Sequence, residues 1–130
     1  MSSATIVTNN PLVERKLSEK YDVRYIEQSY LALLERVRDL VHTGALVLTH
    51  PQAGSIKPGE TPYRTVMVQL PKAPTKPDIE SLALIESAIE GYKKFPQRTH
   101  EFREGSLEDF QMVDYSLIQG AIDSATQCHS

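Results

Sequence analysis

The stretch 50–63 brings together four side chains that could bind or transform a small molecule. They are an imidazole, a hydroxyl, an amine and a carboxylate: His50, Ser55, Lys57 and Glu60. Lys57 and the nearby Arg64 add positive charge, which suits a carboxylate or a phosphate group. Because His50 precedes Pro51, its backbone is expected to be extended, which would hold the imidazole near the end of the preceding strand. This loop is therefore the first place to look for a binding site.

A second set of polar side chains follows the first predicted strand. Residues 4–8 are rich in β-branched side chains, and Asn9, Asn10 and Pro11 come next. That order predicts a strand and then a helix with Asn10 as its N-cap and Pro11 in its first turn. A helix start offers free backbone N–H groups and the positive end of a helix dipole, both of which attract anions. The complete set of candidate ligand-binding residues is Asn9, Asn10, His50, Ser55, Lys57, Glu60, Thr61 and Tyr63.

Two other interpretations of the loop stay open. In the first, Pro51, Pro58 and Pro62 build a rigid Ω-like loop whose polar side chains only satisfy its own backbone groups. In the second, the chain is a small enzyme in which His50 is a general acid or base acting on a phosphorylated or carboxylated metabolite, with Glu60 orienting the imidazole. Proximity in sequence does not establish hydrogen-bond reach, so we lean toward a non-catalytic role.

Several kinds of chemistry are excluded. The segment 54–57 lacks the glycine spacing and the Gly-Lys-Ser/Thr ending of a nucleotide phosphate loop, and no Gly-x-Gly-x-x-Gly follows a strand. The single cysteine, Cys128, allows neither an internal disulfide nor a multi-cysteine metal site, and we expect no metal and no cofactor. The 14 basic and 17 acidic residues give a net charge of −3, which argues against nucleic acid as a partner. No apolar run is long enough to suggest a membrane span.

The apolar pattern predicts elements in the order β-α-β-α-β-β-α-α. Strands are expected at 4–8, 21–27, 45–48 and 65–70, and helices at 11–20, 29–42, 77–95 and from 106 onward. Helices between the early strands predict a small three-layer, Rossmann-like α/β fold with the first three strands parallel. The connection 49–63 has no helical periodicity, so the fourth strand is expected to be antiparallel.

Three local features carry specific expectations. Residues 45–48 are apolar without alternation, which is typical of a central strand covered on both faces. Gly44 follows the 29–42 helix and is expected to take a positive φ. In the last helix, Asp114 is interpreted as a cap at which the helix could split, as it could at Gly120. The expected buried stripe of that helix is Phe110, Val113, Leu117, Ala121 and Ile122.

The helix at 77–95 has an apolar stripe at helical spacing. Its members are Leu82, Ile85, Ile89 and Tyr92. We expect this stripe to pack in the core. A terminal helix pair can also form a dimer face, so a homodimer stays open.

Three motifs at the predicted loop edge resemble those of the GrdX family. They are Thr-Asn-Asn-Pro at 8–11, Leu-Thr-His-Pro at 48–51 and Gly-Ser-Ile-Lys-Pro-Gly-Glu-Thr-Pro-Tyr at 54–63, and the segments 108–110 and 114–118 also match. Members of that family are small proteins encoded beside components of the selenium-dependent glycine and betaine reductases of amino-acid-fermenting anaerobes. The resemblance implies a shared fold and a genomic setting, and it carries over no catalytic residue.

Together these features predict a cytoplasmic accessory protein with one domain over 1–130, of which 127–130 form a disordered tail. The protein would bind a small anionic metabolite or a partner at the loop 50–63, in connection with glycine or betaine reductase metabolism. A non-catalytic assembly factor for a reductase complex, with reductase components as its partners, is a further alternative. It would expose an apolar patch for that contact.

Overall fold

The described helices and strands follow the predicted order. The computed structural model describes residues 4–51, 61–94 and 104–127. The elements are β1 (Ala4–Thr8), α1 (Pro11–Leu17), β2 (Asp22–Tyr25), α2 (Tyr30–His42), β3 (Leu46–Val47), β4 (Thr65–Gln69), α3 (Ile79–Lys94) and α4 (Glu104–Gln127). Of the predicted tail, Gln127 ends α4, and 128–130 lie outside the described residues.

The strands form one mixed sheet with the order β2-β1-β4-β3. β1 pairs in parallel with β2, while β4 is antiparallel to both of its neighbours, β1 and β3. The direction predicted for the fourth strand is therefore confirmed. It also follows that β1, β2 and β3 all run the same way, so their carboxyl ends lie at one edge of the sheet.

The interpretation of residues 45–48 as a central strand is wrong. β3 covers only Leu46–Val47 and lies at the edge of the sheet, because β4 is inserted between it and β1. The outward N–H of Val47 donates a hydrogen bond of 2.9 Å to the Oγ of Ser81 on α3. A continuous apolar run does not distinguish a central strand from a short edge strand that packs beside a helix.

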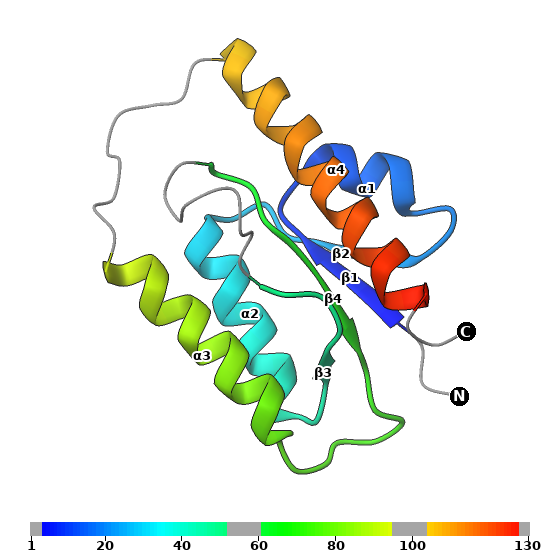
Figure 1. Cartoon of the computed structure of the whole chain (residues 1–130), viewed down its shortest axis with the longest axis vertical. Coiled ribbons are helices and arrows are strands. Elements are labelled where there is room, and N and C mark those ends of the chain that lie inside the picture. The colour runs from blue at the N-terminus through cyan, green and yellow to red at the C-terminus, as the bar shows by residue number, and fades with distance from the viewer. Residues whose placement is uncertain (1–3, 52–60, 95–103, 128–130) are drawn as a thin grey trace.

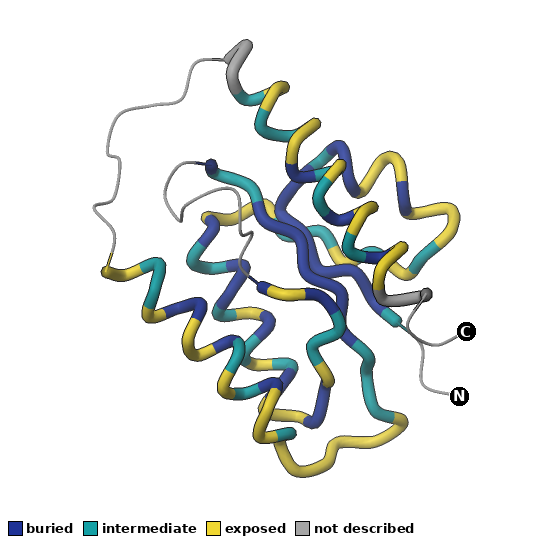
Figure 2. The backbone as a smooth tube through the Cα atoms, in the orientation of Figure 1, coloured by how far each residue is buried: buried dark blue, intermediate teal, exposed yellow. Residues whose placement is uncertain are grey.

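Two helices cover each face of the sheet, which makes three layers (Figure 1). Alternate residues of the central strands supply two separate cores. Val7, Val66 and Val68 pack with α2 and α3, whereas Ile6 and Met67 pack with α1 and α4. The buried strands run between helices whose outer faces are exposed (Figure 2). The predicted three-layer α/β class is confirmed.

Three helices begin at polar residues that favour capping. The side chains of Asn10, Ser29 and Asp78 each accept a hydrogen bond of 3.0–3.1 Å from a backbone N–H in the first turn. The N-cap role predicted for Asn10 is confirmed, with Pro11 as the first residue of α1. Because Asp78 caps α3, this helix begins at Ile79, two residues later than predicted.

The prediction for α4 is wrong in two respects. The helix is unbroken, so neither Gly120 nor Asp114 splits it. Its buried face carries Asp114, Ile118 and Ile122, whereas Val113 of the expected stripe is 42% exposed. The buried residues are four positions apart and share one side of the helix. The apolar spacing fits either Val113 or Asp114 as a buried position of α4. The sequence favours Val113, because valine is found in protein cores more often than aspartate.

The stripe predicted for the core on α3 does face the sheet. Ile85 and Ile89 are buried, and Leu82 and Tyr92 pack against them. The ring of Tyr92 also stacks on that of Tyr30 in α2, with centroids 5.1 Å apart. The dimer interpretation of this stripe is therefore not supported, and the opposite side of α3 is left at the surface.

Gly44 is the residue whose backbone geometry requires glycine. It follows α2 with a φ of +109°, as predicted. A Cβ there would collide with the Cγ2 of Thr75, and the Thr75 N–H is held by a hydrogen bond of 3.0 Å to the Thr43 carbonyl. We expect Gly44→Ala to lower the free energy of unfolding by about 2 kcal/mol, measured by urea denaturation.

Gly120→Ala is the matched control, because a Cβ added at Gly120 meets no atom within 4 Å. Alanine favours the helix, so this substitution should raise the free energy of unfolding by about 0.5–1 kcal/mol. Equal effects of the two substitutions would contradict the role assigned to Gly44.

Candidate functional site

A chain of buried hydrogen bonds lies where β1 ends and β4 begins. The Asn10 N–H donates to the Thr8 hydroxyl at 3.0 Å, and the hydroxyl oxygens of Thr8 and Thr65 are 2.7 Å apart. The Thr65 hydroxyl donates to Oδ2 of Asp114 at 2.7 Å. Since Thr65 uses its one hydrogen on Asp114, Thr8 must be the donor between the two threonines. The hydrogen bonds therefore all point toward the carboxylate, and each polarises the next.

Asp114 is the acceptor at the end of this chain. It lies in the middle of α4 and is only 3% exposed, so its interpretation as a helix cap is wrong. Burial raises the pKa of Asp114 above its usual value, and this outweighs the hydrogen bonds from Thr65 and Asn10 and the positive charge of Arg64, which lower it. A carboxyl group in this position is more easily protonated than one in water.

Asn10 connects α1 to α4. Its Oδ1 caps α1, while its Nδ2 donates hydrogen bonds of 3.0 Å to the Gln111 carbonyl and to Oδ2 of Asp114. The residue is fully buried. Both polar atoms of this predicted ligand-binding side chain are therefore engaged within the protein.

Asn9 holds three connections together. Its Nδ2 donates to the carbonyls of Gln28 and Pro62 at 3.0 and 2.9 Å, and its Oδ1 accepts from the Arg64 N–H at 2.8 Å. These partners follow β2 or precede β4. The side chain thus satisfies backbone groups, as the rigid-loop interpretation expects of the polar residues around this loop.

Arg64 places a guanidinium at the same end of the sheet, although the residue is only 7% exposed. Its Nη2 donates to the His50 carbonyl at 2.8 Å, and its Nη1 lies 4.0 Å from Oδ1 of Asp114. The Nε has no hydrogen-bond partner among the described residues. An unpaired buried donor is costly, on the order of 1–3 kcal/mol. A ligand oxygen could satisfy it.

The described ends of the loop 50–63 converge near Arg64. His50 is exposed and contributes its backbone carbonyl. The buried Thr61 accepts a hydrogen bond of 3.2 Å from the Tyr63 N–H, and the Tyr63 hydroxyl accepts one of 2.9 Å from Nε2 of Gln111. Of the other candidates, Ser55, Lys57 and Glu60 lie outside the described residues and stay predictions.

Sequence reasoning missed most of the residues that build this cluster. They are Thr8, Thr65, Gln111 and Asp114, whereas Arg64 is among the residues expected to bring positive charge to this loop. For Asp114 a signal was present, since it lies four and eight residues before Ile118 and Ile122, on the side of the helix that turned out to be buried. For the threonines the signal was weak, because β-branched hydroxyl residues are common in any strand.

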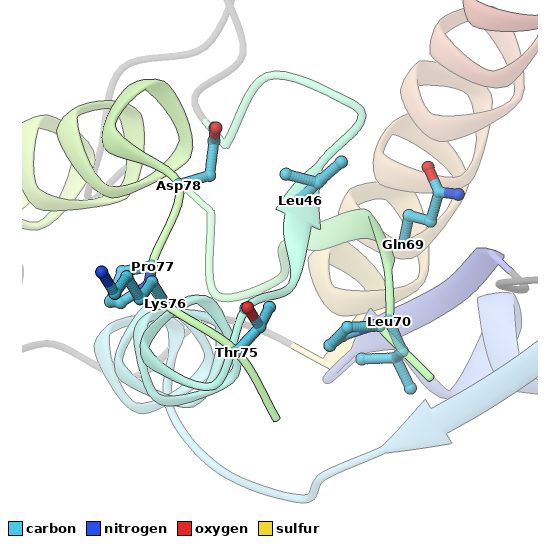
Figure 3. A pocket seen from close by; sticks show the side chains of 9 residues that line it. Leu46, Gln69, Leu70, Thr75, Lys76, Pro77 and Asp78 are labelled. Atoms are coloured by element: carbon cyan, nitrogen blue, oxygen red, sulfur yellow. The ribbon is translucent and has the colours of Figure 1, made fainter. Parts of the chain in front are cut away.

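A hollow of about 390 Å³ lies at the opposite end of the sheet, between the ends of β3 and β4 and the start of α3 (Figure 3). Leu46, Leu70, Thr75 and Asp78 are among the residues that line it. No candidate residue from the sequence does. We place the candidate site at Arg64 because the buried charge and the unpaired donor lie there.

A metal site and a membrane-spanning helix are both absent from the described residues. No group of three or more His, Cys, Asp or Glu side chains in residues 4–51, 61–94 and 104–127 could hold a metal ion. In the same part of the chain, no helix is both long enough and apolar enough to cross a membrane.

Fold and site together define a three-layer α/β domain with a buried charged cluster at the carboxyl ends of its parallel strands. A family model described as GrdX-like protein matches residues 5–123. The chain belongs to the GrdX-like protein family, as its motifs predicted. A search of curated proteins and a search of solved structures found no match.

The raised pKa of Asp114 determines how its contribution to the free energy of unfolding changes with pH. Because its pKa is raised on folding, the folded chain favours the protonated acid. The resulting stability is complete below the usual pKa of 3.8 and is lost as the pH rises through the raised value. Asn at this position does not titrate. We therefore expect the free energy of unfolding of the wild type, relative to Asp114→Asn, to fall as the pH rises from about 4 toward neutrality.

Urea unfolding at a series of pH values measures this difference. Asp109→Asn, at an exposed position of the same helix, is the control and should keep the wild-type pH dependence. If the wild type instead gained stability over the variant as the pH rose, the ion pair with Arg64 would dominate over burial.

Proposed function

We propose that this protein is a non-catalytic accessory protein that binds a small carboxylate or phosphate at Arg64. The observation that carries the proposal is a buried guanidinium whose Nε is unpaired among the described residues. A guanidinium binds carboxylate and phosphate oxygens through two parallel N–H groups, and the Nε edge is one such pair. The ends of the loop 50–63 lie near this guanidinium, since the His50 carbonyl accepts a hydrogen bond from Nη2 of Arg64 and Tyr63 directly precedes Arg64 in sequence.

The relation between Arg64 and Asp114 favours this use. Their closest charged atoms are 4.0 Å apart, which is longer than a hydrogen bond, so the carboxylate does not occupy the guanidinium fork. Burial also raises the pKa of Asp114, and a protonated Asp114 leaves the Arg64 charge uncompensated. An incoming anion would supply that compensation.

The family setting narrows the choice of ligand. Glycine and betaine, the compounds for which the associated reductases are named, are small carboxylates, and an acyl phosphate offers equivalent oxygen atoms. In this proposal the protein acts in the cytoplasm, where a single cysteine stays reduced. The alternative of an enzyme that uses His50 stays a prediction, because Glu60, the expected partner of the imidazole, lies outside the described residues.

Titration calorimetry with glycine, betaine, acetyl phosphate and nucleotides tests the proposal. We expect at least one of the small anions to bind the wild type. Arg64→Lys keeps the charge but loses the planar fork, so it should weaken binding by about tenfold or more, and Arg64→Gln should abolish it. Arg24→Gln removes an arginine whose side chain is 46% exposed and should leave binding unchanged.

Thermal unfolding of each variant separates lost binding from lost folding. Unchanged affinity in a folded Arg64→Gln variant would rule out this site. If the wild type produced no heat with any of the anions, the buried cluster would be structural only.

Contact with a reductase component is a second candidate function, favoured by an exposed apolar pair on α4. Met112 is 58% and Val113 is 42% exposed, directly before the buried Asp114. Adjacent exposed apolar side chains are typical of a surface that another protein covers. This contact and the binding of an anion at Arg64 could coexist, because Met112 and Val113 are exposed whereas Asp114, which lies beside Arg64, is on the buried side of α4.

Co-purification with tagged glycine or betaine reductase components tests this second function. The wild type should be retained, and the double variant Met112→Asp with Val113→Asp should be lost, because two carboxylates would have to be buried. Ser116→Asp, at another exposed position of α4, should be retained. Equal retention of all three proteins, or of none, would count against a contact at this pair.

A further inference from the structure

The outer face of α3 carries a short apolar strip, Ala83 and Leu84, between charged residues, and no described residue covers it. Ile79 at its start is 84% exposed. A hollow of about 440 Å³ follows the helix along Glu80, Ala83, Leu84 and Ser87. The opposite side of the helix already packs in the core, and α3 forms the outside of its layer (Figure 1). α3 thus has one side buried within the chain and, on the other, a small apolar strip that no described residue covers.

Five residues on this outer face are arranged symmetrically about Ser87, and they are flanked by Leu84 and the exposed Glu90, three residues before and after it. Ala83 and Gly91 lie four residues before and after it, and Glu80 and Lys94 lie seven residues before and after it. Helical geometry puts all five on one side of α3. The centre is made of small side chains, and the two ends carry opposite charges about 21 Å apart. Neither Glu80 nor Lys94 forms an ion pair with another described residue.

A face of this kind is complementary to a reversed copy of itself. We propose that it is the interface between two copies of this chain, whose α3 helices cross antiparallel at Ser87. Each Glu80 then faces Lys94 of the partner subunit, and each Ala83 faces the partner's Gly91. Small side chains at the crossing allow the helix axes to approach to about 8 Å. The two-fold arrangement is closed, so it ends at a dimer.

The charges at the two ends of this face favour a second copy over another partner. An antiparallel pair sets the positive end of each helix dipole beside the negative end of the other. The Arg64 site belongs to the sheet edge and to α4, so the dimer does not depend on the proposed anion binding.

Sedimentation equilibrium of the full chain from micromolar to millimolar concentration tests the proposal. We expect the mass of the wild type to rise from 14.6 kDa toward twice that value. Glu80→Lys turns two attractive contacts per dimer into repulsive ones and should weaken association by about tenfold, since each surface pair changes an equilibrium a few-fold. Lys94→Glu should do the same. The double variant Glu80→Lys with Lys94→Glu should restore the dimer.

A bulky charged residue at the crossing point gives an independent test. Ser87→Arg would place two guanidinium groups against each other and should leave only monomer, while Ser116→Arg on α4 should dimerise like the wild type. Circular dichroism checks that each variant is folded. The proposal fails if the wild type stays monomeric throughout, if a folded Ser87→Arg variant still dimerises, or if the double charge swap does not restore association.

Discussion

A carboxylate that is removed from water must be met by hydrogen-bond donors, or it costs several kcal/mol. Asp114 meets this requirement with donors from two other parts of the fold, Thr65 at the start of β4 and Asn10 at the start of α1. Apolar contacts such as those of Ile118 and Ile122 would tolerate sliding of α4 along the sheet. Directional hydrogen bonds do not, so this one carboxylate sets the position of α4 relative to the sheet and to α1.

The same constraint shapes the electrostatics of the site. Asn9 and Asn10 use their side-chain polar atoms to hold loops and helix starts, and the donors that reach Asp114 favour its ionised form. Burial opposes them and prevails. Arg64 therefore lies 4.0 Å from an acid whose pKa is raised by burial. A set of satisfied groups surrounds one guanidinium nitrogen, Nε of Arg64, that has no hydrogen-bond partner among the described residues.

The order of elements, the N-cap of α1, the positive φ of Gly44 and the direction of β4 could all be predicted from sequence, because each follows from local residue chemistry. The edge position of β3 could not, since strand order depends on which chain segment is inserted beside β1. The role of Asp114 could not be assigned from one sequence. Its burial depends on hydrogen bonds from Thr65 and Asn10, which are distant along the chain. The middle of the loop 50–63 stays a prediction.

The antiparallel insertion of β4 has a consequence for how the chain folds. Thr8 and Thr65, which face each other at one end of the two central strands, are 57 positions apart in sequence. β1 therefore cannot acquire its second neighbour until about half of the chain has been synthesised, although α1, β2 and α2 are complete much earlier. Closing so long a connection costs entropy before the strand contacts compensate for it, which slows folding of sheets built from non-local pairs. The arrival of β4, rather than the formation of any helix, is the step expected to limit folding of this domain.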